Sequence, residues 1–479
     1  MNMKKYSMIV GMFIVFFTGI SCSDWLDVRP KSQIIADEQF KTEDGFKDVL
    51  TGVYVSMASP QLYGRELSFG LIEVLSQNYD LDGGNVYHYA GEYDYENVAV
   101  RPTIESVWSG LYNNIANLNL LLEHIDRANK NIFVGHNWEV TKGEALGLRA
   151  FLLFDLLRIF SSSHAAEPSA PAIPYVDSYS TKITPQMKVS EVLERLVLEL
   201  NEAAALLKYD PLATCSVDSA YYNQNRQRRF NYFAAKATLA RVYLYKNDKP
   251  NALACAEEII ENEKRFSWVA QSSIETANAN DRNLLFIGEH VFGLHVSEME
   301  DNIKGYFTSV SGSNALTVSE PNIRLYYEMD GGLAADWRQT YLFSYDGGVR
   351  YPSKMWQYNN PKNDYSKKMP LIRKTEMYYI AAECLKESNP DSAVVLLNTV
   401  RNHRNLGTSL DLSKSLTAPE IQQEIFKEYR KELICEGQLF FYYKRLNLPQ
   451  IEGAALPGNK RVYVLPMPES ELEFGEREQ

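Results

Sequence analysis

Apolar residues recur at helical spacing along most of the chain. In the segment 108–125 they return every three or four residues, which predicts an amphipathic helix. The segment 143–160 is apolar on nearly every side, a pattern typical of a buried central helix. The segment 189–207 is amphipathic again, with Ser190 as its expected N-cap, and follows a loop at 166–185 that is rich in Pro, Ser and Ala. The pattern therefore predicts a mostly α-helical protein.

Two segments have the layout of a tetratricopeptide helix pair. The first, 230–262, holds a helix at 231–245, a turn around Pro250 and a second helix that ends near 261. The second, 373–403, repeats this frame with a turn at Asn389-Pro390. Small residues let two helices approach closely, and large ones fill the groove between them. The residues in these positions are Leu239, Ala240, Tyr243 and Ala252 in the first pair, and Ile380, Ala381, Ala393, Leu397 and Val400 in the second.

Residues 266–369, here called the lobe, lie between the two pairs and differ from them in composition. Helical periodicity fades there, and aromatic residues stand among glycines and serines. Short strands are predicted at 284–291 and 349–356. A final helix at 419–446 and an irregular tail follow the second pair. The predicted fold is a tetratricopeptide-like helix-pair superhelix with an irregular, loop-rich lobe that carries a few short strands.

The first 21 residues have the three parts of a signal peptide. Lys4 and Lys5 form a positive head, an apolar run covers 8–17, and small residues lead to Cys22. The run is too short to span a bilayer, and no later stretch is long enough. We expect cleavage before Cys22 and lipid attachment to it, as in a bacterial lipoprotein. The alternative is simple secretion, with Cys22 only near the cleavage site.

Composition and charge narrow the classes of function. The chain has 479 residues, of which 45% are hydrophobic and 23% charged, as in folded soluble proteins. The formal net charge is −12, and it becomes −14 once the two lysines of the signal peptide are removed. A nucleic-acid-binding protein would normally be basic, so no nucleic-acid partner is expected. Because the negative charge repels anions, neutral polysaccharides or peptides are favoured over anionic glycans as ligands.

Cysteine and acidic motifs give no support for a metal site. No pair of cysteines has CxxC spacing, and the expected state of those after residue 22 is a free buried thiol. Asp80 and Asp82 precede Gly83-Gly84 like half of a calcium loop, but a full loop needs more acids at set spacing. We therefore expect no metal and no cofactor. The four later cysteines are Cys215, Cys255, Cys384 and Cys435.

Glu428, Glu432 and Glu436 recur every four residues and raise the question of catalysis. Paired carboxylates hydrolyse glycosides when they face each other across a cleft. These glutamates alternate with Arg430 and Lys431, which favours a salt-bridged helix face. The sequence also lacks the common hydrolase, zinc-protease and nucleotide-binding motifs. We expect the protein not to be an enzyme.

Several segments together carry a family resemblance. They are Cys22-Ser23-Asp24-Trp25-Leu26-Asp27-Val28; Trp108 with Tyr112, Ile115 and Asn119; Gly143-Glu144-Ala145 through Arg149-Ala150 to Phe154-Asp155-Leu156-Leu157-Arg158; Ala240-Arg241-Val242-Tyr243-Leu244-Tyr245; Arg373 with Glu376, Ala382 and Glu383; Leu397-Asn398-Thr399-Val400-Arg401; and Glu428-Tyr429-Arg430-Lys431-Glu432-Leu433 with Glu436-Gly437. With these motifs the chain resembles the SusD/RagB family of outer-membrane nutrient-binding lipoproteins, over nearly its whole length. Gln438 and Tyr443-Lys444 depart from the family pattern, in which Arg and Asp-Leu are common.

The resemblance implies an organisation and a role. The expected organisation is a lipoprotein signal peptide at 1–21, an N-terminal helical region at 22–265 with an aromatic loop at 78–102, the lobe, and a C-terminal helical region and tail at 370–479. The implied protein is anchored by lipid to the outer membrane and faces the cell exterior. It binds oligosaccharide or polysaccharide and passes it to a SusC-type TonB-dependent transporter as its lid. The alternative is a peptide-binding lid of the RagB type.

The resemblance also implies where ligand is bound. In relatives, ligand contacts come from the loop before the helix of Trp108 and from the irregular lobe. Aromatic rings stack on the apolar faces of sugars, and carboxylates bond the hydroxyls. On an extended segment Tyr87 and Tyr89 would share one face, as would Tyr93 and Tyr95. The alternative for all these rings is packing in the core. The expected ligand-binding residues are Asp80, Asp82, Tyr87, Tyr89, Tyr93 and Tyr95 in the loop, and Trp268, Trp337, Tyr345 and Trp356 in the lobe.

Overall fold

The computed structural model describes residues 37–214, 225–356 and 366–477. The predicted signal peptide, Cys22 and Cys215 lie outside the described residues. The longer helices are α3 Glu43–Met57, α6 Arg101–Arg127, α7 Asn137–Phe160, α8 Val189–Leu207, α10 Tyr232–Tyr245, α11 Lys249–Ile260, α16 Lys374–Leu385, α17 Pro390–Asn402 and α18 Ala418–Glu432. The shorter helices are α4 Leu71–Leu75, α5 His88–Gly91, α9 Pro211–Thr214, α12 Gln271–Ile274, α13 Met299–Lys304, α14 Glu320–Tyr326, α15 Trp337–Tyr341, α19 Leu439–Arg445, α20 Lys460–Tyr463 and α21 Glu469–Phe474. None of these described helices is long and apolar enough to cross a membrane.

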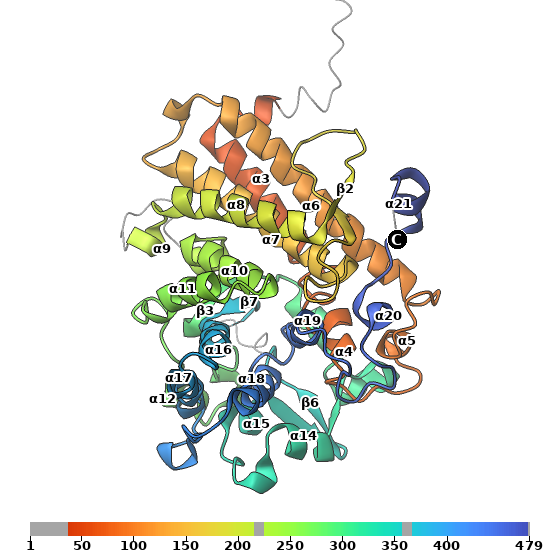
Figure 1. Cartoon of the computed structure of the whole chain (residues 1–479), viewed down its shortest axis with the longest axis vertical. Helices are drawn as coiled ribbons and strands as arrows, with labels where there is room; N and C mark the ends of the chain where they lie inside the picture. The colour runs from red at the N-terminus through yellow and green to blue at the C-terminus, as the bar shows by residue number, and fades with distance from the viewer. Residues whose placement is uncertain (1–36, 215–224, 357–365, 478–479) are drawn as a thin grey trace, which may run out of the picture.

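The long helices form one continuous array, in which each packs on the next. The order of packing is α3, α6, α7, α8, α10, α11, α16, α17 and α18. In Figure 1 the array runs from α3 and α6 at the top to α17 and α18 below, with the lobe at the lower end. The mostly α-helical, tetratricopeptide-like fold predicted from the sequence is thereby confirmed.

The two predicted helix pairs are α10 with α11 and α16 with α17. Asn231 caps α10 by accepting from the amide of Ala234, and Asn389 caps α17 by accepting from that of Ser392. Both α11 and α17 have a proline in their first turn. Proline lacks a backbone N–H, and in the first turn of a helix that N–H would have no acceptor within the helix. Although the lobe separates the pairs in sequence, α11 packs directly on α16. The lobe is therefore an insertion between two consecutive repeats of the array.

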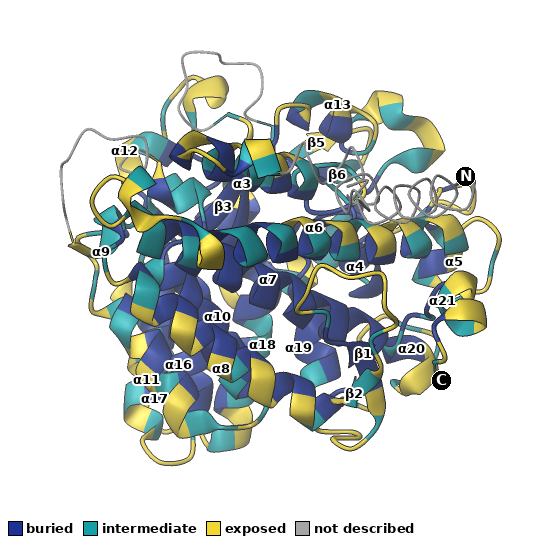
Figure 2. Cartoon of the chain, turned by 90° about the horizontal axis from the view of Figure 1, so that it is seen from above, coloured by how far each residue is buried: buried dark blue, intermediate teal, exposed yellow. Residues whose placement is uncertain are grey.

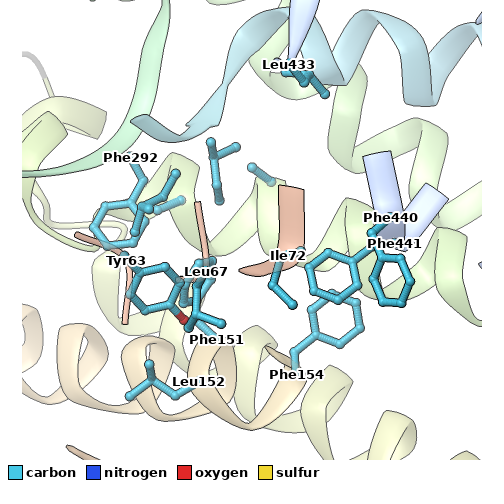
Figure 3. Packing of buried hydrophobic residues seen from close by; sticks show 14 of the residues in the cluster. Tyr63, Leu67, Ile72, Phe151, Leu152, Phe154, Phe292, Leu433, Phe440 and Phe441 are labelled. Atoms are coloured by element: carbon cyan, nitrogen blue, oxygen red, sulfur yellow. The ribbon is translucent and has the colours of Figure 1, made fainter. Parts of the chain in front are cut away.

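Helix α7 is the centre of the N-terminal half. Nearly all residues from Val140 to Phe160 are buried, as the all-round apolar pattern predicted, and Figure 2 shows the helix in dark blue beneath α6. On α7, the centre of the Phe151 ring lies 5.6 Å from that of the Phe292 ring on β3, and 5.8 Å from that of the Tyr63 ring (Figure 3). Aromatic rings at these separations pack edge to face or tilted. The lobe and the helical array thus share one core.

Within the residues that the structure describes, the strands form three small antiparallel sheets. They are β1 Pro171–Pro174 with β2 Gln186–Lys188; β3 His290–His295 with β7 Lys368–Arg373; and β4 Val318–Ser319, β6 Val349–Pro352 and β5 Phe343–Asp346, in that order. The strand expected at 349–356 is found in β6. The one expected at 284–291 is misplaced, because residues 287–289 form a 3-10 turn and the strand β3 begins only at His290.

Several helix boundaries differ from the sequence prediction. The helix expected at 108–125 is α6, which begins at Arg101, and the one expected at 143–160 is α7, which begins at Asn137. The helix α8 begins at Val189 with Lys188 as its N-cap, so Ser190 lies inside the first turn and does not cap it. The expected helix at 419–446 is two helices, α18 and α19. Between them Cys435 and Gly437 adopt positive φ angles of 64° and 66°. A Cβ on Gly437 would lie 2.6 Å from the Leu67 carbonyl oxygen, so the turn there requires glycine.

Candidate functional site

The aromatic loop and the lobe meet along a joint that starts at Asp80. Its backbone amide donates to the Thr317 carbonyl oxygen at 2.8 Å. One carboxylate oxygen accepts from the amide of Ser319 at 2.6 Å, and the other from the side chain of Asn322 at 2.9 Å. Asp80 therefore forms an isolated antiparallel bridge with Thr317, the residue directly before β4.

A second set of contacts closes the joint a few residues further on. The Asn85 side chain donates to the carbonyl oxygens of Ser313 at 2.9 Å and Ala315 at 3.2 Å. The amide of Val86 donates to the side chain of Asn314 at 3.2 Å. We call residues 80–87 and 313–322 the junction. The two segments that the family resemblance singled out for ligand contact therefore lie side by side, next to α4 and α5 in Figure 1.

A cavity of about 170 Å³ opens beside the junction. Its floor holds Glu66, whose buried carboxylate accepts from Arg65 Nε at 2.7 Å, from the hydroxyl of Tyr87 at 3.0 Å and from the Leu71 amide at 3.2 Å. This carboxylate is fully engaged, so it holds the floor rigid. The remaining lining residues are Leu71, Val86, Ala90, Ala99, Val100, Thr103 and Tyr306.

Arg65 and Tyr306 form the polar wall of this cavity. Arg65 Nη1 donates to the Tyr306 hydroxyl at 3.1 Å, and its guanidinium lies 5.4 Å from the centre of the same ring. The ring of Tyr306 is 5.9 Å from that of Tyr87, at an angle of 42°. Burial, and then the neighbouring Glu66 carboxylate, raise the pKa of Tyr87 well above its usual value. Tyr87 is therefore a neutral hydrogen-bond donor inside the wall.

Tyr89 stands in sequence between Tyr87 and Ala90, which line the cavity, but it is not itself a lining residue, and its ring is exposed to solvent. Residues 88–91 form the short helix α5, so the extended segment assumed from the sequence is wrong, and Tyr87 and Tyr89 point in different directions. The side chain of Tyr87 is 5% exposed and that of Tyr89 is 43% exposed. The ring of His88 packs edge-on against Tyr89 at 5.2 Å. Of the four loop tyrosines, Tyr89 has the ring best placed to meet a ligand from solvent.

Tyr93 and Tyr95 lie in the core. Both rings are buried and meet edge to face at 6.4 Å. The hydroxyl of Tyr93 donates to the carbonyl of Leu75 at 3.0 Å, and that of Tyr95 to the carbonyl of Val462 at 2.6 Å. These bonds anchor the loop to α4 and to α20, so the alternative of core packing fits these two residues and Tyr87.

The carboxylates of Asp80 and Asp82 hold loops together. Asp80 bonds the lobe as described above, and Asp82 accepts from the amide of Gly84 at 2.8 Å. Within the described ranges no group of three or more His, Cys, Asp or Glu side chains is placed to hold a metal ion. Both carboxylate oxygens of Asp80 accept hydrogen bonds from the lobe, so Asp80 positions the junction. Asp82 is exposed and accepts one hydrogen bond within its own loop.

Trp268 and Trp337 lie away from the junction. The ring of Trp268 stacks on His403 at 4.1 Å and carries Lys374 Nζ at 3.5 Å from its centre, so both faces are covered. The ring of Trp337 is buried, and its Nε1 donates to Glu275 at 2.9 Å. Neither ring offers a free face in this structure.

The other two lobe candidates differ in exposure. Tyr345 is 64% exposed at the end of β5, where it pairs across the sheet with Arg350, whose guanidinium lies 5.8 Å from the ring centre. Trp356 is half-buried against the core at the end of a described range, and its buried Nε1 has no hydrogen-bond partner among the described residues. Among the described rings of the lobe, Tyr345 is therefore the one that solvent reaches most fully.

The glutamates weighed as catalytic residues belong to a buried ionic cluster. Glu428 and Glu432 lie on α18, whereas Glu436 lies beyond its end, so the three do not share a helix face as expected. All three are buried and paired with arginine or lysine. The described thiols, those of Cys255, Cys384 and Cys435, are free and buried as predicted.

A larger cavity, of about 800 Å³, lies on another part of the molecule. It is bounded by the end of α3 with the turn at Ser59-Pro60, by the 3-10 turn Arg226–Arg228, and by the end of β3. Its main ring, Tyr54, is covered by Arg229 at 5.3 Å and is tied through its hydroxyl to Glu144. The junction has exposed rings beside it, and we therefore regard the junction as the better candidate for sugar binding.

Of the residues that line the junction cavity, only Tyr87 was predicted as a site residue; the charged and aromatic ones among the rest, Arg65, Glu66 and Tyr306, were not. Arg65 and Glu66 form a charged pair within the mostly apolar stretch 62–72, and this pattern is visible in the sequence. Tyr306 is one of many lobe aromatics, and the sequence does not distinguish it from its neighbours.

Comparison with known families and proteins gives matches to the SusD family along nearly the whole chain. Residues 216–471 match the model of the SusD family, and residues 24–244 match a SusD-like model described as starch-binding associating with outer membrane. The SusD-like protein P2 of Formosa agariphila is 24% identical over 98% of this chain and 97% of the relative. The SusD-like protein P25 of the same organism is 21% identical over 91% of this chain and 88% of the relative.

Solved structures share the fold. A SusD-like carbohydrate binding protein from Bacteroides vulgatus superposes with a TM-score of 0.71 at 19% identity, over 91% of this chain and 97% of the other. A SusD superfamily protein from Bacteroides thetaiotaomicron gives a TM-score of 0.69 at 20% identity, over 91% and 98%. At such identities the likeness concerns the fold alone.

Proposed function

Because the chain belongs to the SusD family, we propose that it is a cell-surface lipoprotein that binds oligosaccharides or polysaccharide at the junction. In this proposal it passes them to a SusC-type TonB-dependent transporter, of which it is the lid subunit. The lipid at Cys22 anchors it to the outer membrane, facing the exterior, and the chain itself catalyses no reaction.

The observation that carries the proposal is the meeting of the aromatic loop with the lobe. Hydrogen bonds of Asp80 and Asn85 hold the two segments together, and a cavity lined by the Arg65 guanidinium and the Tyr306 phenol lies beside them. The exposed ring of Tyr89 neighbours the lining residues Tyr87 and Ala90 in sequence. A sugar presents an apolar face of CH groups and a rim of hydroxyls. The ring of Tyr89 suits the first, and Arg65 with the hydroxyl of Tyr306 suits the second.

Tyr345 offers a second platform on β5, the edge strand opposite β4, whose Ser319 amide donates to Asp80. Its ring is open, and Arg350 beside it is held by Glu320 at 2.7 Å. A long polysaccharide could contact both platforms, whereas a short oligosaccharide would need only one. The size of the junction cavity admits one sugar ring more readily than a chain, so most of a polymer would lie on the surface.

The experiment compares mobility in native gels that contain a panel of neutral and acidic polysaccharides. The soluble chain from Ser23 to Gln479 is run beside the variants Tyr89→Ala and Tyr345→Ala. Removing one stacked ring should weaken binding by about 1–3 kcal/mol, roughly five- to a hundredfold in Kd. We expect retardation in one neutral polysaccharide, reduced in Tyr89→Ala.

Tyr179→Ala is the matched control. Tyr179 is 56% exposed, in the loop between β1 and β2, away from the junction. Equal binding by Tyr89→Ala, Tyr345→Ala and the unmodified chain would refute the junction site, and the change Val55→Arg would then test the larger cavity. If no polysaccharide retards the chain and the chain binds peptides, the ligand is a peptide and the glycan proposal is wrong.

A further inference from the structure

The lining of the junction cavity is apolar apart from one connected group of polar side chains and a threonine. Its apolar residues come from α4, from α5 and from the turns beside α5; they are Leu71, Val86, Ala90, Ala99 and Val100. The polar residues are Arg65, Glu66, Tyr87, Thr103 and Tyr306, of which all but Thr103 are joined by hydrogen bonds. A ligand that fills the cavity must therefore offer an apolar group together with a few polar atoms.

The connected polar group has donors that remain available to a ligand. Arg65 donates from Nε to Glu66 and from Nη1 to Tyr306, and its Nη2 has no hydrogen-bond partner among the described residues. The Tyr306 hydroxyl oxygen accepts from Arg65, so its own proton is free to be donated. The Glu66 carboxylate, the strongest acceptor of the lining, is already engaged by Arg65, Tyr87 and Leu71. The cavity can therefore hold a ligand oxygen that accepts from Arg65 and Tyr306.

The acceptor that suits this cavity is a neutral one. The charge of the Arg65 guanidinium is matched by the Glu66 carboxylate at 2.7 Å. A carboxylate or phosphate of the ligand would bring a second negative charge close to Glu66 in a partly closed space, where like charges repel each other more strongly than in water. A hydroxyl group would avoid this repulsion, but it offers nothing to the apolar lining. A carbonyl group that carries a methyl group meets both conditions.

Thr103 adds a hydroxyl group in the first turn of α6. The residue is half-buried in the lining, and its backbone amide donates to the Val100 carbonyl oxygen at 3.0 Å. Its hydroxyl has no hydrogen-bond partner within the described ranges, and a hydroxyl oxygen can accept from an N–H group. An amide therefore suits this lining better than an ester, because an amide supplies an N–H as well as a carbonyl oxygen.

We propose that the junction cavity binds the acetamido group of an N-acetylhexosamine. This inference rests on the proposed function, because it names the class of glycan that the junction takes. The amide carbonyl oxygen accepts from Arg65 Nη2 and from the Tyr306 hydroxyl, the amide N–H donates to the Thr103 hydroxyl, and the methyl group lies against the apolar residues. A cavity of about 170 Å³ has room for this substituent and part of its sugar ring, and the rest of the glycan stays outside.

Saturation-transfer NMR of the soluble chain, from Ser23 to Gln479, tests the inference with three pairs of sugars. In each pair a hydroxyl replaces the acetamido group: N-acetylglucosamine with glucose, N-acetylgalactosamine with galactose, and N-acetylmannosamine with mannose. We expect at least one N-acetyl sugar to bind about tenfold more tightly than its partner, because it buries a methyl group and forms a further hydrogen bond. Its acetyl methyl protons should receive the most saturation. Equal affinities within every pair, or no binding by any N-acetyl sugar, would overturn the inference.

Three variants place the bound sugar. Ala99→Leu enlarges an exposed residue of the lining and should abolish binding of the N-acetyl sugar. Val98→Leu is the matched control, since Val98 is the neighbouring residue, is 87% exposed and is not among the described lining residues. It should leave the affinity unchanged. Tyr306→Phe removes one donor and should weaken binding about fivefold. An N-acetyl sugar that binds Ala99→Leu as tightly as the unmodified chain would lie elsewhere, and the inference would be wrong.

The native gels described above separate this inference from the proposed function. A polysaccharide may retard the chain, and less so Tyr89→Ala, while the two sugars of every pair bind equally well. That result would overturn the preference for an acetamido group and leave the glycan-binding function in place. If no polysaccharide retards the chain and no sugar of any pair binds, both the inference and the proposed function are wrong.

Discussion

Replacing Glu432 by Gln should be among the most damaging single changes in this protein. The Glu432 carboxylate is completely buried and accepts from three guanidiniums: those of Arg373, Arg404 and Arg338. The contacts with Arg404 are 2.9 Å and 2.7 Å, and that with Arg338 is 3.1 Å. Burial opposes the charged form, but these arginines lower the pKa of Glu432 well below its usual value. The residue is therefore a buried anion.

The size of the effect follows from what Gln would leave behind. Breaking a buried ion pair by removing one partner costs about 3–5 kcal/mol, because the other charge stays buried without compensation. Here three guanidiniums lose the shared negative charge, and one of the two acceptor oxygens becomes an NH2 donor, although other carboxylates such as Glu289 remain beside them. We expect a loss of about 3–5 kcal/mol, a large part of the roughly 5–15 kcal/mol that holds a typical protein folded.

Urea unfolding of the soluble chain, followed by circular dichroism, measures this loss as a shift in midpoint at unchanged slope. The matched control is Glu123→Gln, which breaks an exposed pair with Arg127 on one face of α6 and should cost less than about 0.5 kcal/mol. A loss below about 1 kcal/mol for Glu432→Gln would refute the reasoning, since it would mean that the cluster contributes no more than a surface pair.

Three other outcomes are expected. Gly437→Ala should destabilise by about 2 kcal/mol or more, because an L side chain there is strained at φ 66° and meets the Leu67 carbonyl; a urea midpoint within error of the parent would argue against this. Burial opposes ionisation of Glu428, but neighbouring cations lower its pKa in the folded state to about 2. The Glu428 carboxylate therefore stabilises the fold fully above its unfolded pKa near 4.5, and this contribution is lost as the pH falls from there toward 2. The free energy of unfolding, measured as a function of pH with Glu428→Gln as control, tests this loss. Burial raises the pKa of Cys255 to about 11 and of Cys384 to about 12, so in a Cys215→Ser background a thiol reagent at pH 8 should react with them only on unfolding; rapid labelling of the native chain would contradict their burial.

The helical array was largely predictable because its signals are local. The 3.6-residue period, the cap at Asn389 and the prolines of the first turns can all be recognised within one segment. The break between α18 and α19 was missed because its cause is distant. The amide of Gly437 donates to Glu73, 364 positions earlier, and no local pattern predicts that contact.

The candidate site was less predictable, since aromatic residue types do not reveal which faces are free. Tyr87 and Tyr89 are two positions apart, yet one lies in the wall of the cavity and the other faces solvent, because the segment coils into α5. The ring of Trp268 looked equally promising in sequence, but His403 and Lys374 cover its two faces from elements that follow more than 100 residues later. Long-range contacts of this kind decide exposure.

The lobe is an insertion between two stacked repeats, and this placement decides how it could be exchanged for the lobe of a relative. Its two ends enter and leave the array at α11 and α16, which already touch, so a lobe from a relative could be grafted there without rebuilding the frame. The graft would still have to carry the ionic partners that reach into the body. Without Arg338 and Lys354, buried carboxylates of the α18 region such as Glu428 and Glu436 would lose cations. A grafted lobe would thus bring two things at once: the side chains that contact the ligand and the cations that the helical array needs.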